Sequence, residues 1–347
     1  MGVLVVLFII GIILSLRLSS NVSTGSLSIQ TTGQMEGLLV LLVILSHISL
    51  SDYENKLYPK SSAWLYVANM GNLVVALFFF ISGYGLIKQL SSRGPSYLSN
   101  FWKHRFGSVA LPYLLCIIIY YLYYAMTQSM SLLYFVEDLW SRFIHGHSLV
   151  EFTWFIEVIL FLYATFYLAA KLVRFKILPM IILITLAVLL FAFIVYKLKF
   201  GNFWYDSILC FPLGLFWAWI EPQIIKYIRN WPIYISSISV TFVLFFVLFF
   251  QMKKLAPFSS LFLTTCIMLI SYRLTLKNSF LLKVKKIGLE VYLYQGIFFM
   301  LLRGNFFFIH NTLLFGITFL LSTLFFASII HTFLHSISDY FPKNFFY

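Results

Sequence analysis

The chain has 347 residues, of which 61% are hydrophobic and only 10% are charged. A soluble domain carries about 25% charged residues, so this composition excludes a soluble enzyme. The net charge of +13 does not indicate a nucleic-acid partner, because the basic residues fall in short segments between apolar runs, as they do in membrane proteins. Cys116, Cys210 and Cys266 lie in apolar runs at unrelated spacings, which predicts neither disulfides nor a metal site.

The apolar runs have the length that a helix needs to cross a hydrocarbon core of about 30 Å. They are continuous rather than alternating, which favours membrane helices over membrane strands. We therefore predict an all-α fold, a polytopic transmembrane helix bundle of about 10–11 spans. The expected spans cover residues 1–16, 36–51, 64–87, 107–127, 153–170, 177–196, 203–220, 232–250, 257–272, 287–302 and 312–335.

Residues 1–32 are expected to form an additional N-terminal span and a short polar loop. Residues 33–340 are expected to form one transmembrane domain, with no separate soluble domain. The distribution of Lys and Arg predicts the orientation. With the N-terminus outside, about two thirds of the 24 Lys and Arg residues lie on the cytoplasmic side, and the segment 128–150 becomes the longest outer loop.

A histidine and an acid bracket the apolar run Gly37–Leu50: Glu36 precedes the run and His47 lies near its far end. Eleven helical residues place the two on one face, roughly 16 Å apart. Ionisable groups inside a span are costly and usually functional. His47 is either hydrogen-bonded to a neighbouring carbonyl or acts as a general base or proton shuttle. Glu36 either complements the helix dipole, with Gly33 as the N-cap, or takes part in catalysis.

The stretch from Phe78 to Leu86 (FFFISGYGL) carries two glycines around a tyrosine near the inner end of a span. Small residues allow close helix packing, which is one interpretation. The other is an opening beside a ligand, where Ser82, Gly83 and Tyr84 line a pocket.

Two acids, Glu157 and Glu290, occur inside apolar runs. Each is expensive there unless it is paired or faces a cavity. They are the strongest internal acid candidates, and a structural partner on a facing helix is the alternative for both.

A basic inner loop carries Arg93, Lys103 and Arg105, with His104 between the last two. These cations either simply set the orientation or form a docking site for the phosphates of a nucleotide or pyrophosphate.

Taken together, these motifs resemble membrane-bound acyltransferase family 3, the bacterial carbohydrate O-acyltransferases. In that family a basic residue stands eleven positions before a histidine, and Glu36 to His47 matches the spacing and the histidine. Its second span reads FF-x-x-SG-Y/F, and the segment 79–84 (FFISGY) is similar, with the same SG-Y ending. Further similar stretches are Arg105 before Pro112-Tyr113, Trp154-Phe155, Phe211-Pro212-Leu213-Gly214 and Ile287-Gly288 to Tyr292-Leu293-Tyr294.

The chain departs from the family pattern at three positions. Glu36 reverses the charge of the basic residue, Ser108 replaces the second arginine of an R-x-x-R element, and Gln295 stands where a histidine often closes the late motif. The donor would then be held by Arg105 or Lys103.

The resemblance implies transfer of an acetyl group from cytoplasmic acetyl-CoA to a hydroxyl of a cell-envelope or extracellular polysaccharide or its lipid-linked precursor. It implies a multi-pass protein of the bacterial plasma membrane, without a bound cofactor, whose partners are the acyl-CoA donor, a carbohydrate acceptor, the lipid bilayer and other envelope polysaccharide assembly proteins. The expected roles are catalysis by His47 and Glu36, donor binding by Lys103, Arg105 and Arg93, and pocket lining by Ser82, Gly83, Tyr84, Trp154, Glu157 and Glu290.

Two other functions fit the same residues. Intramembrane acids and glycine-interrupted spans also occur in transporters and flippases, although no repeated halves are visible in this sequence. The reversed charge at Glu36 is equally compatible with an inactive scaffold in an envelope-assembly complex.

Overall fold

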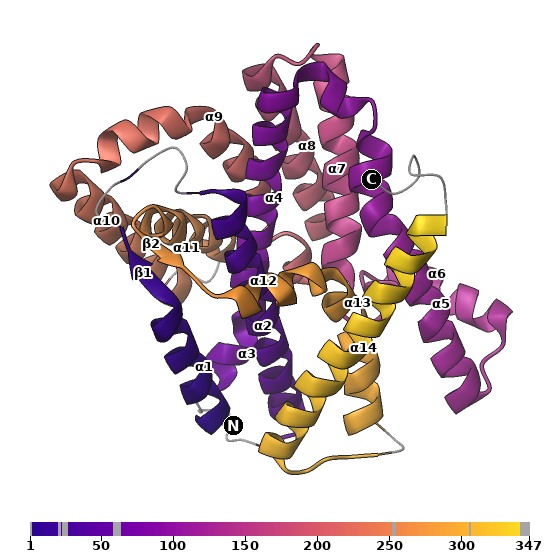
Figure 1. Cartoon of the computed structure of the whole chain (residues 1–347). Helices are drawn as coiled ribbons and strands as arrows, with labels where there is room; N and C mark the ends of the chain where they lie inside the picture. The colour runs from indigo at the N-terminus through magenta and orange to yellow at the C-terminus, as the bar shows by residue number, and fades with distance from the viewer. Residues whose placement is uncertain are drawn as a thin grey trace. The chain divides into compact units, whose positions relative to one another are not determined.

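The computed structural model describes residues 2–19, 22, 27–57, 64–251, 255–304 and 307–340. Most of them (82%) are helical, which confirms the all-α prediction (Figure 1). The chain divides into two compact units, each made of two segments. The first unit comprises Met1–Ser92 and Tyr205–Lys286, and the second comprises Arg93–Trp204 and Ile287–Tyr347.

The first unit contains eight helices of the described chain and its one pair of strands. They are α1 (Gly2–Ser15), β1 (Leu16–Leu18), α2 (Ile29–Glu54), α3 (Trp64–Asn69), α4 (Gly71–Arg93, of which Arg93 belongs to the second unit), α9 (Cys210–Ile228), α10 (Trp231–Phe250), α11 (Ala256–Ser271), β2 (Leu274–Leu276) and α12 (Ser279–Lys286).

The second unit is built from the remaining helices of the described chain. They are the 3-10 helix η1 (Gly94–Leu98), the π-helical turn η2 (Trp102–Gly107), α5 (Ser108–Gln128), α6 (Leu132–Ile144), α7 (Trp154–Leu172), α8 (Ile177–Lys197), the 3-10 turn η3 (Asn202–Trp204), α13 (Gly288–Arg303) and α14 (Thr312–Tyr340). Within this unit α13 packs along α14 and also contacts α5, and α7 packs on α8 (Figure 1).

A helix lies at every one of the predicted spans. Seven helical segments of the described chain are long and apolar enough to cross a membrane, and α11 is a shorter apolar helix. The outward faces fit this environment: Val240, Phe242, Val243 and Phe246 of α10 are all exposed. Apolar side chains on the outside of a bundle are expected where lipid, not water, is the solvent.

Two details of the sequence interpretation were wrong. The segment 128–150 is not simply a loop, because Ser131 caps the helix α6 by accepting a hydrogen bond from the backbone N–H of Tyr134 (3.3 Å). Helix α2 begins at Ile29 rather than near Gly33, because Ser28 accepts from the N–H of Thr31 (3.2 Å) and forms the N-cap. The helix start therefore lies about one and a half turns before the expected place.

The first unit is held at one end by a short antiparallel ladder. Strand β1 pairs with β2, with Arg17 opposite Thr275, and joins segments that are far apart in the sequence. The side-chain amide of Asn278 donates to Ser15 Oγ (2.9 Å) beside the ladder. These contacts attach the N-terminal helix α1 to the segment that leads into α12.

Candidate functional site

Helix α2 carries both residues of the histidine–acid motif. His47 is half-buried, whereas its neighbours Ser46, Ser49 and Asp52 are buried. The hydroxyl of Ser46 donates to the carbonyl of Ala68 in α3 (2.9 Å). The sequence interpretation missed Asp52, although an acid five residues after a histidine in the same helix was a visible signal. The half of α2 around His47 is therefore polar on its buried face.

Glu36 forms an ion pair with a lysine of the short basic helix α12. The Nζ atom of Lys285 lies 3.4 Å from Glu36 Oε2, and both side chains are partly exposed. Helix α12 approaches closely because Gly37 has no side chain, since a Cβ there would collide with the carbonyl of Leu281. Glu36 lies about two turns inside α2, so the first-turn interpretation of this acid is wrong.

The tyrosine of the FFFISGYGL motif belongs to a buried polar network. Tyr84 Oη donates to both carboxylate oxygens of Glu221 in α9 (2.9 and 3.0 Å). Lys88 Nζ donates to Glu221 Oε2 (2.5 Å) and Tyr272 Oη donates to Oε1 (2.9 Å). The indole N–H of Trp217 donates to Tyr272 Oη (3.1 Å). Every oxygen of this buried carboxylate is therefore satisfied.

Helices α4 and α9 pack closely at two glycines, one on each helix. A Cβ on Gly83 would collide with the carbonyl of Phe211 in α9, and a Cβ on Gly214 would collide with the carbonyl of Phe80 in α4. Gly83 thus lies against a neighbouring backbone, as small residues do in membrane helix pairs. Ser82 is half-buried on the same helix. The sequence interpretation missed Glu221, although an acid beside Pro222 in an apolar run was a signal.

In the second unit, Glu157 accepts three hydrogen bonds near the start of α7. The donors are Tyr113 Oη (2.6 Å), the backbone N–H of Leu149 (2.9 Å) and Thr153 Oγ1 (3.3 Å). Trp154 opens α7 as predicted and is half-buried. All three bonds converge on Oε1, and Oε2 has no hydrogen-bond partner among the described residues.

Glu290 pairs with a histidine that the sequence interpretation did not single out. His331 Nδ1 lies 2.8 Å from Glu290 Oε1, so α14 is linked to α13 by an imidazole–carboxylate contact. The Glu290 side chain is only 7% exposed. His331 and His335, four residues apart in an apolar run, lie with their ring centres 4.4 Å apart. This spacing was the signal in the sequence.

The basic segment lies at the entry to α5. Lys103 and Arg105 belong to the π-helical turn η2, and Arg93 ends α4. Arg105 Nε donates a hydrogen bond to Tyr97 Oη (3.1 Å), which orients the guanidinium group. Single π-helical turns often occur at functional sites. The three cations therefore belong to one unit, as the inner-loop interpretation requires.

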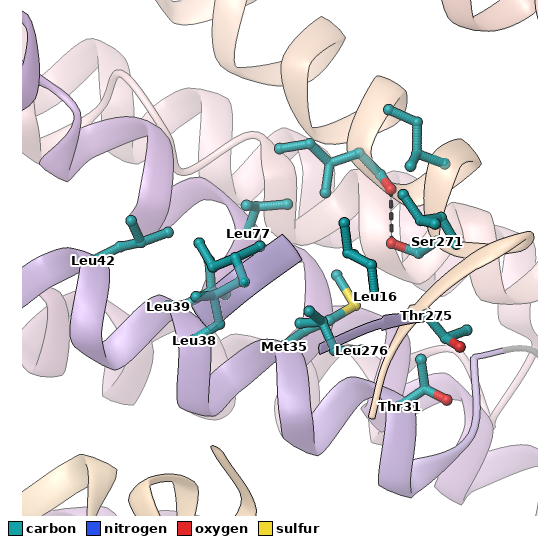
Figure 2. A pocket seen from close by; sticks show the side chains of 14 residues that line it. Leu16, Thr31, Met35, Leu38, Leu39, Leu42, Leu77, Ser271, Thr275 and Leu276 are labelled. Atoms are coloured by element: carbon teal, nitrogen blue, oxygen red, sulfur yellow. Dashed lines mark hydrogen bonds between the residues drawn. The ribbon is translucent and has the colours of Figure 1, made fainter. Parts of the chain in front are cut away.

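An apolar cavity of about 200 Å³ lies within the first unit. Figure 2 shows Met35, Leu38, Leu39 and Leu42 of α2 along it, with Ser271 on another side. The Ser271 hydroxyl donates to the carbonyl of Ile267 (2.7 Å), so it is already satisfied. No side chain in the lining is ionisable. The cavity can hold an apolar group but supplies no acid or base.

The units divide the predicted site residues into two sets. The first unit holds His47, Glu36, Ser82, Gly83 and Tyr84, and the second holds Arg93, Lys103, Arg105, Trp154, Glu157 and Glu290.

Comparison with known proteins identifies the family. A family model described as an acyltransferase domain, of acyltransferase family 3, matches residues 34–332. No curated protein and no solved structure gives a match. The matched range begins in α2, two residues before Glu36, and ends in α14, one residue after His331. The chain therefore belongs to acyltransferase family 3 and is a multi-pass membrane acyltransferase.

Proposed function

We propose that the protein is an O-acetyltransferase of the bacterial plasma membrane. It transfers an acetyl group from cytoplasmic acetyl-CoA to a hydroxyl of a cell-envelope or extracellular polysaccharide or of its lipid-linked precursor. The observation that carries the proposal is the family match from residue 34 to residue 332, which includes every proposed site residue. Other proteins of envelope polysaccharide assembly are the expected partners.

His47 is the proposed general base. Its imidazole removes the proton of the acceptor hydroxyl while that oxygen attacks the thioester carbonyl, the C–S bond breaks, and the thiolate of CoA leaves. A positioned base of this kind contributes about 10²–10⁴-fold to the rate. The buried polar residues around His47 support a site that excludes bulk water, which protects the thioester from hydrolysis.

Lys103, Arg105 and Arg93 are the proposed contacts of the donor. CoA carries phosphate and pyrophosphate groups, which guanidinium and ammonium groups bind well. The hydrogen bond that Arg105 donates to Tyr97 pre-orients one of these cations, so less side-chain entropy is lost when the phosphate binds.

Lys285 is the proposed substitute for the basic residue that the family pattern has at the position of Glu36. The ammonium group of Lys285 lies beside the Glu36 carboxylate, so a positive charge is present at this end of α2 although it comes from α12. Glu36 would then act by holding Lys285 in place.

The test is acetyl transfer by the purified protein in vesicles. Radiolabelled acetyl-CoA is supplied at the cytoplasmic face of the protein, and a cell-surface glycan is the acceptor. We expect His47→Ala to lower the transfer rate about 10³-fold. His147→Ala is the matched control, because His147 is an exposed histidine outside the proposed site, and it should transfer label at the wild-type rate.

Two results would count against the proposal. If wild-type protein transfers no label to glycan, acetyl transfer to this class of acceptor is wrong. If His47→Ala transfers label as fast as the wild type, His47 is not the base, although the family assignment is unaffected.

A further inference from the structure

The contact between Glu290 and His331 has the geometry of a catalytic imidazole–carboxylate pair. The Nδ1–H of His331 donates to Glu290 Oε1 over 2.8 Å. A carboxylate in this position fixes the tautomer and ring orientation of a histidine and stabilises its protonated form. The Nε2 atom of His331 has no hydrogen-bond partner among the described residues. It is therefore the atom through which this histidine can act.

A purely structural pair would be expected to have all of its buried polar atoms hydrogen-bonded, and this pair does not. Glu290 is 93% buried by its side chain, and its Oε2 atom has no hydrogen-bond partner in the described part of the chain. Buried polar atoms are nearly always satisfied, so an exception calls for a reason. The buried hydroxyl of Tyr294, one turn further along α13, also lacks a partner. Ionisable groups in a membrane bundle are kept mainly where they function.

The orientation predicted from charge places this pair on the donor side. Glu290 lies in the first turn of α13, directly after the basic helix α12, and His331 lies in the C-terminal third of α14. Both are thus expected near the cytoplasmic face, where acyl-CoA arrives. Lys103 and Arg105 belong to the same unit. The His331 side chain is 25% exposed, so a ligand can reach it.

We propose that His331 is a general acid for the departing thiol of CoA and that Glu290 is its positioning residue. This inference rests on the proposed acetyltransferase function. As the acceptor oxygen attacks the acetyl carbon, the C–S bond breaks and its electron pair moves to sulfur. The sulfur takes the proton from Nε2 of protonated His331 and becomes a thiol. His331 then recovers a proton from cytoplasmic water, and the proton of the acceptor hydroxyl passes to the general base of the reaction.

The test compares two donors that differ in one atom, acetyl-CoA and its selenoester analogue acetyl-seleno-CoA. A selenolate is a weaker base than a thiolate and leaves without a proton, whereas every contact of the nucleotide part is kept. We expect His331→Gln to lower kcat about 10²-fold with acetyl-CoA and by less than about fivefold with the selenoester. Glu290→Gln should show the same selectivity with a loss of about tenfold for acetyl-CoA.

The matched control is His310→Gln, the same substitution at an exposed histidine of the same unit, outside α13 and α14. It should stay within about twofold of wild type with both donors. A merely structural role of the pair would lower both donors by one factor. If both His331→Gln and Glu290→Gln do this, or if neither loses activity with acetyl-CoA, the inference is overturned and the acetyltransferase function stands. A wild-type protein that is inactive with acetyl-CoA would instead remove the function on which the inference rests.

Discussion

Two buried carboxylates of this protein, Glu221 and Glu290, differ in how fully their oxygens are hydrogen-bonded. In the first unit, Glu221 accepts from Tyr84, Lys88 and Tyr272, and both of its oxygens are satisfied. In the second unit, Glu290 has one described donor, His331, and an oxygen without a partner. A saturated carboxylate that ties α4, α9 and the residue after α11 together is suited to stability, and a half-satisfied one beside an imidazole is suited to proton transfer.

The largest expected effect is on the folded state of the first unit. Glu221→Ala removes the acceptor of three side chains, and the hydroxyls of Tyr84 and Tyr272 are then left buried without it. We expect a loss of about 3 kcal/mol in the free energy of unfolding, measured by thermal or denaturant unfolding in detergent. Lys88 adds little to this loss, because it is 43% exposed and can turn to solvent.

Glu137→Ala is the control for that measurement, because Glu137 is an exposed acid on α6. It should change stability by less than about 0.5 kcal/mol. If Glu221→Ala is as stable as this control, the network around Glu221 does not stabilise the bundle. The structural role assigned to Glu221 is then wrong.

The second expected effect is on rate rather than stability. Glu290→Gln keeps the side-chain shape but removes the charge that supports protonated His331, so the rate of transfer from acetyl-CoA falls about tenfold, equivalent to about 1.4 kcal/mol. The unfolding free energy should change by less than about 1 kcal/mol, because only one hydrogen bond is altered. A variant that loses stability without losing rate would make Glu290 a structural residue like Glu221.

A pair of tyrosines sharpens the comparison at the level of single hydroxyls. Tyr84→Phe deletes a hydroxyl that is bonded to Glu221 and should cost about 1 kcal/mol of stability. Tyr294→Phe deletes a buried hydroxyl without a partner among the described residues and should be neutral or slightly stabilising. Equal losses in the two variants would show that hydrogen-bond satisfaction is not what separates the two regions.

The smallest expected effect on stability is at the partly exposed pair of Glu36 and Lys285. Exposed ion pairs contribute about 0–1 kcal/mol, so Lys285→Ala should leave unfolding almost unchanged. Its acetyl-transfer rate should fall several-fold if Lys285 supplies the positive charge, and Lys283→Ala, an exposed lysine of the same helix, is the control. Unequal stability with equal rates in these two variants would contradict the proposed role of Lys285.

The sequence predicted the helices well because each apolar run is a local signal. Every expected span corresponds to a helix, and the start of α7 at Trp154 was placed correctly. The start of α2 was missed because Ser28 lies in a polar stretch, where a cap is a single side-chain hydrogen bond. The short helix α6 was missed because the polar and charged residues that mark loops also occur on amphipathic helices.

The partners of the buried acids could not be predicted in the same way. Glu157 and Glu290 were identified by their cost in an apolar run, but Tyr113 and His331 are 44 and 41 residues away in the sequence. Lys88 and Glu221 are 133 residues apart. Such pairs depend on which helix faces which, and that is set by packing details such as the glycine contacts at Gly83 and Gly214.

The most direct measurement is the transfer of radiolabelled acetyl from acetyl-CoA to glycan in vesicles, made at equal amounts of folded protein. Wild type and Glu221→Ala should transfer label at similar rates per folded molecule, Glu290→Gln about tenfold more slowly, and His47→Ala at about the background rate. Full activity of His47→Ala, or the absence of transfer by the wild type, would contradict the acetyltransferase account.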